Sequence, residues 1–267
     1  MKRIKLVSFV FIVMVAFVFA LVGCKNGGSD LDKIKEAGVI NVGITIYDPM
    51  DYFAEDGETI IGFDADLANE FAKELGVRAR FTLIAWDEKV LELNGGYIDL
   101  IWNGMTASDE LGTKIDFSKA YATNYQCVVV KKGAESGFNS SEDLKGKQVA
   151  VEKGSAGDEV ISEIVTPNRV NAQLDALNEV KAGTSVAAVI DYTMAYSVVG
   201  KGDFTDLVII AADKISFEQE VFAVGARKGS DIIAKLDEFL QKKYEDNSLQ
   251  TLATKYGVAI NDEAFKK

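Results

Sequence analysis

The sequence has no histidine among its 267 residues and only two cysteines. Without histidine, neither a Ser-His-Asp nor a Cys-His catalytic set can form, and most zinc sites lose their nitrogen ligands. Cys24 follows an N-terminal apolar run, which leaves Cys127 without a disulfide partner in the folded body. Cys127 itself lies in the apolar run 125–130 and is interpreted as a small buried residue. The composition therefore predicts no cofactor, no metal ligands and a fold stabilised by its apolar core.

The N-terminus predicts an export signal. Basic residues precede an unbroken apolar run from Leu6 to Val22. The run is roughly as long as the shortest helix that can span a membrane. An uncleaved transmembrane anchor is therefore the alternative to a cleaved signal. Leu-Val-Gly-Cys at 21–24 resembles the lipobox of bacterial lipoproteins, whose cysteine is acylated and begins the mature chain. We therefore expect residues 1–23 to be a cleaved signal peptide, Cys24 to carry a lipid such as palmitate, and residues 24–30 to form a flexible tether.

Positive charge is also scarce. The chain has 29 Lys and Arg against 41 Asp and Glu, and the predicted signal peptide holds three of the basic residues and none of the acidic ones, which leaves a formal charge of −15. Such an acidic surface repels nucleic acid and anionic lipid headgroups. We expect a soluble monomeric body outside the cell membrane that binds no nucleic acid.

Strand and helix patterns alternate in two rounds along the chain. The first round has strand patterns at 39–44, 79–83 and 98–102 and helical patterns at 63–75 and 86–93. The second has strand patterns at 148–152, 186–190 and 207–211 and helical patterns at 142–144, 158–165 and 192–199, before an amphipathic helix at 231–244. This alternation predicts two α/β units, each too small for a Rossmann dehydrogenase.

A glycine-containing turn lies between a predicted strand and helix at 152–157. It matches neither a phosphate-binding loop nor a dinucleotide-binding fingerprint. Its Ser155 could receive a ligand carboxylate at the start of the helix or cap the helix itself. Taken alone, the pattern favours capping.

Several stretches occur in the order and spacing of one protein family. They are Lys33 to Gly43, Gly62 to Ala68, Asn103 to Thr106 with Ile115 to Tyr121, and Ala187 to Asp191 followed by Gly225 to Gly229. Each is weak alone, but together they cover almost the whole predicted mature chain. They resemble the substrate-binding lipoproteins of amino-acid ABC importers, bacterial solute-binding protein family 3, which includes the glutamine- and histidine-binding proteins.

The resemblance implies a periplasmic-binding-protein-like type II fold, with two α/β lobes, a two-strand hinge and a ligand cleft between the lobes. The expected first lobe comprises residues 31–121 and 224–267, and the second comprises 128–218. The hinge crossings are expected at 122–127 and 219–223. Such a protein captures a small polar solute, most often an amino acid, and delivers it to an ABC permease in the membrane.

The resemblance also implies a set of ligand-binding residues. They are aromatic rings at Tyr47 and Trp86, a strand end and turn for the ligand carboxylate at Asn103, Gly104 and Thr106, an opposing helix start at Ser155 and Ala156, and an acid for the α-ammonium at Asp191. The two rings could instead belong to a core. Asp191 could instead be an ordinary helix N-cap, but the ligand role is favoured because a desolvated ammonium needs an anion beside it.

One position departs from the family pattern. Leu111 stands where most relatives carry an arginine that clamps the ligand carboxylate, and losing such a contact costs about 1.5 to 3 kcal/mol. Three explanations stay open: backbone N–H groups and a hydroxyl hold the carboxylate, the cation comes from Lys114 or Lys153, or the ligand has no free α-carboxylate. Asn124 and Gln126, at the first crossing, are further polar groups that could reach a ligand.

Two alternative functions remain open on the same fold. Some relatives have become cyclohexadienyl dehydratases, which need an acid and a cation for the substrate carboxylates. Leu111 argues against the cation, and no residue indicates the acid, so we expect no catalysis. A receptor that presents its ligand to a sensor protein, without transport, would have the same sequence features; a permease and an ATPase encoded beside this chain would favour import.

Overall fold

The structure, a computed structural model, describes residues 28–266. The predicted signal peptide and Cys24 lie outside this range. Helix α1 (Asp30–Ala37) begins within the predicted tether, because the hydroxyl of Ser29 accepts the N–H of Asp32 and caps the helix. Between residues 28 and 266, no helix is long and apolar enough to cross a membrane.

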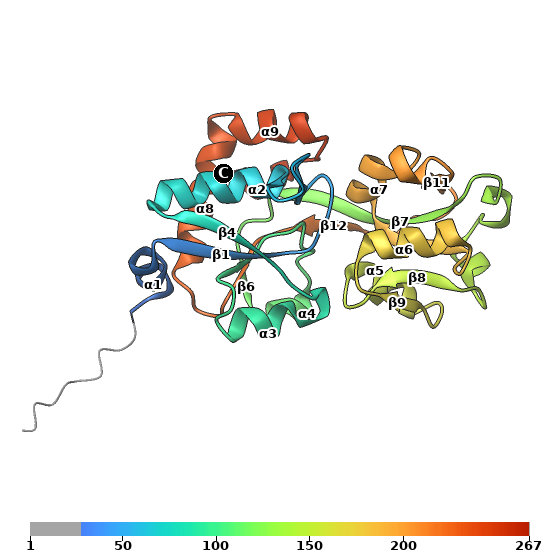
Figure 1. The fold of residues 1–267 in the computed structure, drawn as a ribbon, viewed down its shortest axis with the longest axis horizontal. Coiled ribbons are helices and arrows are strands. Elements are labelled where there is room, and N and C mark those ends of the chain that lie inside the picture. The colour runs from blue at the N-terminus through green and yellow to red at the C-terminus, as the bar shows by residue number, and fades with distance from the viewer. Residues whose placement is uncertain (1–27, 267) are drawn as a thin grey trace, which may run out of the picture.

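The first lobe is built on a five-stranded sheet with the order β4-β1-β5-β13-β6. The strand β1 (Val39–Ile44) runs parallel to both of its neighbours, β4 (Arg78–Leu83) and β5 (Leu100–Ile101). The strand β13 (Gly225–Ala226) pairs antiparallel with β5 and with β6 (Asp116–Phe117). Because β13 comes late in the chain, the C-terminal segment returns to complete this lobe (Figure 1).

Helices surround this sheet. They are α2 (Phe63–Leu75), the 3-10 helix η1 (Trp86–Glu88), α3 (Lys89–Asn94), α4 (Asp109–Gly112), α8 (Ile232–Glu245), α9 (Ser248–Tyr256) and η5 (Asp262–Phe265), with a small hairpin of β2 (Tyr52–Phe53) and β3 (Ile60–Ile61). Phe71 of α2 packs between Trp102 and Phe239, with ring centroids 6.2 and 5.3 Å away. Truncating such a ring to alanine usually costs 3–5 kcal/mol.

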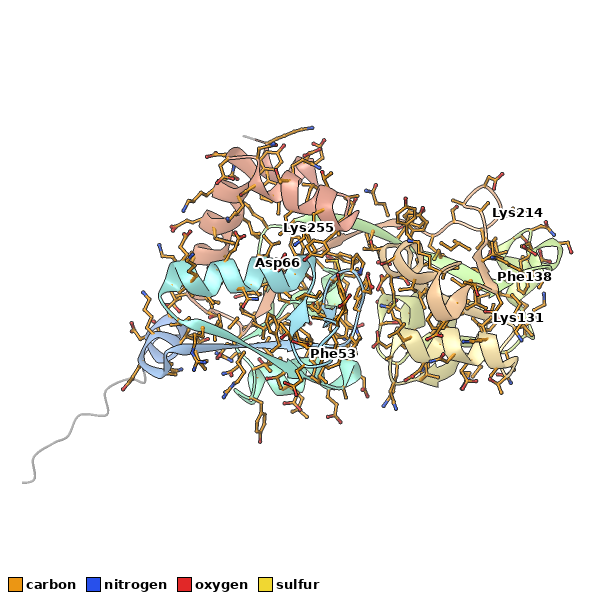
Figure 2. The ribbon with its side chains drawn as sticks, turned by 45° about the horizontal axis from the view of Figure 1, so that its top comes forward. Phe53, Asp66, Lys131, Phe138, Lys214 and Lys255 are labelled. Atoms are coloured by element: carbon orange, nitrogen blue, oxygen red, sulfur yellow. The ribbon has the colours of Figure 1, made fainter. Side chains whose placement is uncertain are left out.

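The C-terminal helices are attached to this lobe by side chains as well as by packing. Lys255 of α9 forms a 2.9 Å salt bridge with Asp66 of α2, and Figure 2 shows the two residues on these neighbouring helices. The hydroxyl of Tyr256 donates to the same carboxylate at 2.8 Å. Residues almost 190 positions apart therefore stabilise one lobe.

The second lobe has a sheet with the order β11-β7-β10-β8-β9. Its strands are β7 (Ala122–Lys131), β8 (Val149–Glu152), β9 (Asn168–Val170), β10 (Ala187–Asp191) and β11 (Leu207–Ile209). Its helices are α5 (Ala156–Ser162), α6 (Gln173–Ala182), α7 (Tyr192–Val198), and the 3-10 helices η2 (Glu135–Gly137), η3 (Ser141–Leu144) and η4 (Gly202–Phe204). Since α5 and α6 both pack on β8 and β10, every residue of these two strands is buried.

Two antiparallel strands connect the lobes. The first half of β7 pairs with β12 (Gln219–Phe222), and its second half enters the sheet of the second lobe beside β10 and β11. Figure 1 shows β7 and β12 crossing between the two bodies; β7 contains all of the expected crossing 122–127, and β12 contains residues 219–222 of the expected crossing 219–223. The expected fold of two α/β lobes joined by two strands is confirmed.

Candidate functional site

A cleft of about 690 Å³ lies between the two lobes. All eight residues that the sequence pointed to line it: Tyr47, Trp86, Asn103, Gly104, Thr106, Ser155, Ala156 and Asp191. The first five come from the first lobe and the last three from the second. The fold thus brings together residues up to 144 positions apart, while their contacts with a ligand stay predictions.

Asn103 and Gly104 form hydrogen bonds that fix the strand end on the first-lobe side of the cleft. The Oδ1 of Asn103 accepts the N–H and the hydroxyl of Thr45, both at 2.8 Å, while its Nδ2 donates to Thr45 O at 3.0 Å and to Asp51 Oδ2 at 2.7 Å. The N–H of Gly104 donates to Asp64 Oδ2 at 2.6 Å. These polar groups therefore fix the shape of the strand end, and both acids that hold them are fully buried.

The two buried acids have perturbed protonation. Burial raises the pKa of Asp64 to about 7, against the opposing hydrogen bonds from Gly104 and Tyr121. Burial also raises the pKa of Asp51, and the nearby charge of Asp64 raises it further. The strand end at Asn103 is therefore hydrogen-bonded to two carboxyl groups, Asp51 and Asp64. Their raised pKa values disfavour the state in which both are ionised.

Tyr47 packs against this strand end. Its ring is 2% exposed and meets Phe222 edge-on, with the centroids 6.4 Å apart. Gly104 has a φ of +55°, and a Cβ there would lie 2.7 Å from Cε1 of Tyr47. Glycine is therefore required at this position both by the left-handed backbone and by the close approach of the ring.

Trp86 begins η1, and its ring is in contact with Lys89, a residue that the sequence analysis did not select. The ammonium of Lys89 lies 4.6 Å from the centroid of the Trp86 ring and donates to Trp86 O at 3.1 Å. It also donates across the cleft to Gly154 O at 2.9 Å. Burial lowers the pKa of Lys89 to about 8, although the charges of Glu152 and Asp87 oppose this shift.

Thr106 faces the hinge. Its hydroxyl donates to Glu220 Oε2 at 2.8 Å, and the same oxygen accepts weaker hydrogen bonds from Asn124 at 3.3 Å and Gln126 at 3.1 Å. Glu220 lies on β12, so these hydrogen bonds join Thr106 of the cleft to the hinge strands. A hydroxyl has one proton to donate, and in this arrangement Thr106 gives it to a protein carboxylate.

Ser155 caps α5. Its Oγ accepts the N–H of Asp158 at 3.1 Å, which confirms the capping interpretation of its side chain. Ala156 is the first helical residue. Asp158 is itself held by a 2.8 Å salt bridge to Arg169.

Asp191 ends β10 and occupies the N-cap position of α7, as the alternative interpretation expected, but its side chain makes no capping hydrogen bond. Its carboxylate accepts the side-chain amides of Asn124 at 2.5 Å, of Gln126 at 2.7 Å and of Gln173. Asn124 performs the capping instead, because its Oδ1 accepts the N–H of Thr193 at 3.2 Å. Burial raises the pKa of Asp191 to about 7, with a smaller contribution from Glu220.

Glu152 is a second acid that the sequence analysis missed. It is the last residue of β8, it lines the cleft, and it is 2% exposed. Its Oε1 has no hydrogen-bond partner between residues 28 and 266. Burial and then the charge of Asp191 raise its pKa to about 8, against the attraction of Lys89. The sequence did contain a signal for Glu152, because it is an acid at the end of a predicted strand and precedes a turn that contains glycine.

The lobes touch at the mouth of the cleft. Lys153 of the second lobe forms a 2.5 Å salt bridge with Asp87 of the first. On the hinge side, the hydroxyl of Ser197 donates to Asp48 Oδ1 at 2.5 Å. Together with the hydrogen bond from Lys89 to Gly154, these contacts join the two lobes.

Leu111, at the position where the family resemblance implied an arginine, also lines the cleft. Neither lysine considered as its replacement is unpaired: Lys114 forms a 2.6 Å salt bridge with Glu110, and Lys153 is bound to Asp87. The explanation that takes the cation from one of these lysines is therefore weakened.

Comparisons with known proteins place these features in a family. A family model described as bacterial extracellular solute-binding proteins, family 3, matches residues 40–259. The L-cystine-binding protein TcyJ of Escherichia coli (strain K12) is 31% identical over 231 residues, which cover 85% of each chain. A crystal structure of a mutant of ArgBP from T. maritima has a TM-score of 0.79 at 31% identity and covers 85% of this chain and 98% of that one.

A second solved structure bears on the enzymatic alternative. The ancestral amino acid-binding protein AncCDT-1, a precursor of cyclohexadienyl dehydratase, has a TM-score of 0.78 at 30% identity, and the match covers 85% of this chain and 99% of that one. The family model spans most of the sequence, and these structures share its two lobes and hinge. The chain therefore belongs to family 3 of the bacterial extracellular solute-binding proteins, as its sequence predicted.

Proposed function

We propose that this protein captures an amino acid or a close analogue in the cleft between its lobes and delivers it to an ABC permease. The observation that carries the proposal is Asp191, a buried carboxylate that lines the cleft and has only neutral amides as hydrogen-bond donors in the described chain. An ammonium group that loses its water when the lobes close needs such an anion. TcyJ, named for L-cystine, and ArtP of Bacillus subtilis, named for arginine, support an amino-acid ligand.

The ligand carboxylate is held more weakly than in most of the family. Leu111 offers no hydrogen bond, and the hydroxyl of Thr106 donates its proton to Glu220. The backbone of the strand end remains as a donor, but the N–H of Gly104 is bound to Asp64. Amino-acid analogues that lack an α-carboxylate therefore belong among the candidate ligands.

A thermal-shift screen of the chain from Cys24 onward tests this function. The panel contains the common amino acids, dipeptides, amines, organic acids and sugars. An amino acid or analogue is expected to raise the melting temperature in proportion to the logarithm of its concentration, because it binds only the folded state. A rise with a sugar and with no amino acid or analogue would contradict the proposal.

The mature protein is proposed to be held at the outer face of the cell membrane by a lipid on Cys24. This residue lies outside the described range, so the support is the sequence pattern alone. Cells grown with a clickable fatty acid are expected to label the wild-type protein, and Cys24→Ser should abolish the label. Equal labelling of the two proteins would refute the anchor at this residue.

The enzymatic alternative gains one observation from the structure. Glu152 is a buried acid with a pKa near 8, and a protonated carboxyl group is what a dehydratase needs. The cation for the substrate carboxylates is still missing, because Leu111 provides none and Lys114 is paired with Glu110. We therefore favour binding without catalysis; formation of an aromatic product from a cyclohexadienyl acid would reverse this choice.

A further inference from the structure

Two neighbouring strands of the second lobe end in buried acids. The strands β8 and β10 are parallel and paired, and their last residues, Glu152 and Asp191, both line the cleft. Their exposed fractions are 2% and 6%. Two carboxylates are thus concentrated at one edge of the sheet, largely shielded from water.

These two carboxylates have no cationic hydrogen-bond partner within the described chain. Asp191 is bound by three neutral amides, and Oε1 of Glu152 is bound by none. Buried charge of this kind is costly unless an opposite charge compensates it. The nearest cation, Lys89, attracts Glu152 but directs its hydrogen bonds to two backbone carbonyls.

The other basic side chains that line the cleft are already used. Lys114 is paired with Glu110 at 2.6 Å, and Arg169 with Asp158 at 2.8 Å. Apart from Lys89, the positive charge that lines the cleft is therefore paired with protein carboxylates, whereas Asp191 and Glu152 form no salt bridge with any residue between 28 and 266. A neutral zwitterion would satisfy Asp191 and leave Oε1 of Glu152 without a hydrogen-bond partner in the described chain, with the Gln173 amide and the attraction of Lys89 as the interactions of that carboxylate.

We propose that the ligand carries two positive groups, one beside Asp191 and one beside Glu152, and is therefore a net cation such as a basic amino acid or a diamine. This inference rests on the proposed function, because it assigns the ligand class of the same cleft. Glu152 is the residue that selects for the second positive group. A ligand of the same size with a neutral end is discriminated against.

The protonation of the site agrees with a cationic ligand. Asp175 on α6 raises the pKa of Glu152 together with Asp191, Lys89 on α3 lowers it, and Glu220 on β12 raises the pKa of Asp191. Because both pKa values are raised, a bound cation must displace protons from the site. Binding is then expected to become tighter as pH rises from about 6 to about 8, with proton release that calorimetry in two buffers can measure.

Isothermal titration calorimetry with matched ligand pairs tests the proposal directly. L-arginine is compared with L-citrulline, which replaces the guanidinium by a neutral urea, and L-lysine with L-norleucine. The charged member of at least one pair, or the diamine putrescine, is expected to bind at least about tenfold more tightly than the neutral members. Equal or tighter binding of the neutral members would overturn the proposal.

Substitution of Glu152 provides the second arm. Glu152→Gln keeps the shape of the side chain and is expected to reduce the preference for the charged over the neutral ligand about tenfold or more. Glu163→Gln, an exposed acid at the end of α5, is the matched control and should leave the preference unchanged. An unchanged preference in Glu152→Gln, or an equal loss in the control, would refute the role of Glu152.

The results separate this inference from the proposed function. If L-glutamine or L-cystine binds in the cleft while arginine, lysine and putrescine do not, the protein is still an amino-acid-binding protein and only the charge of the ligand is wrong. If a sugar is the only ligand, both proposals fail. The melting temperature of each variant without ligand shows whether it is folded.

Discussion

Replacing Gly104 by alanine tests how the first lobe shapes the wall of the cleft. Gly104 has a φ of +55°, a conformation that costs an L-residue about 1–2 kcal/mol. A new Cβ would lie 2.7 Å from Tyr47 Cε1 and 3.3 Å from both Met50 Cγ and Phe222 Cε2. Because these three side chains are at most 2% exposed, none can move aside without disturbing the core.

The expected loss of stability combines two contributions. Forcing an extra methyl group into a packed core typically costs 1–3 kcal/mol, so with the backbone strain the total is roughly 2–5 kcal/mol. For a chain of this size, each kcal/mol lowers the melting temperature by about 2–4 °C. We therefore expect Gly104→Ala to melt roughly 4–20 °C below the wild type.

The assay is thermal unfolding of the ligand-free protein followed by circular dichroism. Gly137→Ala is the control, because nothing lies within 4 Å of a Cβ at this position. Its free energy of unfolding should change by less than about 0.5 kcal/mol. A Gly104→Ala variant that melts within about 2 °C of the wild type would contradict this reasoning. It would show that neither the left-handed backbone nor the close contact with Tyr47 requires glycine at this position.

Three further predictions concern the closing contact, pH and the missing arginine. Lys153→Met removes the half-exposed salt bridge with Asp87 and should lower the free energy of unfolding by less than about 1 kcal/mol in urea titrations; a loss above about 2 kcal/mol would contradict this. Burial raises the pKa of Asp64 and of Asp191 to about 7, which favours their protonated forms in the folded state. Stability of the ligand-free protein should therefore fall as the pH rises from about 4 to about 7, less steeply in Asp191→Asn, and a rise would refute the assignment. Leu111→Arg should strengthen binding of ligands with an α-carboxylate about ten- to a hundredfold relative to decarboxylated analogues in calorimetry, and an unchanged ratio would remove Leu111 from the carboxylate site.

Local patterns predicted the elements whose signals lie within a few residues. The helix at 63–75 has the predicted bounds because its buried residues repeat at helical spacing and a glycine stands at each end. The strand at 39–44 also has the predicted bounds. Helix α6 (Gln173–Ala182) was missed because two of its buried residues, Gln173 and Ala176, add little to an apolar periodicity. The helix expected at 158–165 begins earlier, at Ala156, because Ser155 caps it.

The site was only partly accessible from the sequence. Resemblance to a family located the positions that line the cleft, but not which of their hydrogen bonds the protein uses itself. Asn103 and Gly104 are bound by Asp51 and Asp64, which lie 52 and 40 residues away. Only the folded backbone brings such groups together, so no local pattern could reveal these bonds.

The charge of the cleft was missed for the same reason. Lys89 reaches Gly154, 65 residues further along the chain, and this contact depends on how the two lobes lie against each other. Glu152 could have been noticed by the argument that selected Asp191, since both acids end a strand. Its importance comes from its burial and from the absence of a partner for Oε1 in the described chain, which only the packed structure shows.

The central claim is that an amino-acid-like solute binds in the cleft beside Trp86. The chain has two tryptophans: Trp86 lines the cleft, whereas Trp102 is fully buried between Phe71 and Tyr121. Fluorine NMR of protein labelled with 5-fluorotryptophan, with Trp86→Phe to assign the two signals, reports on both positions. A ligand that raises the melting temperature is predicted to shift the Trp86 signal strongly and the Trp102 signal much less. Saturating ligand that leaves the Trp86 signal in place would contradict the account.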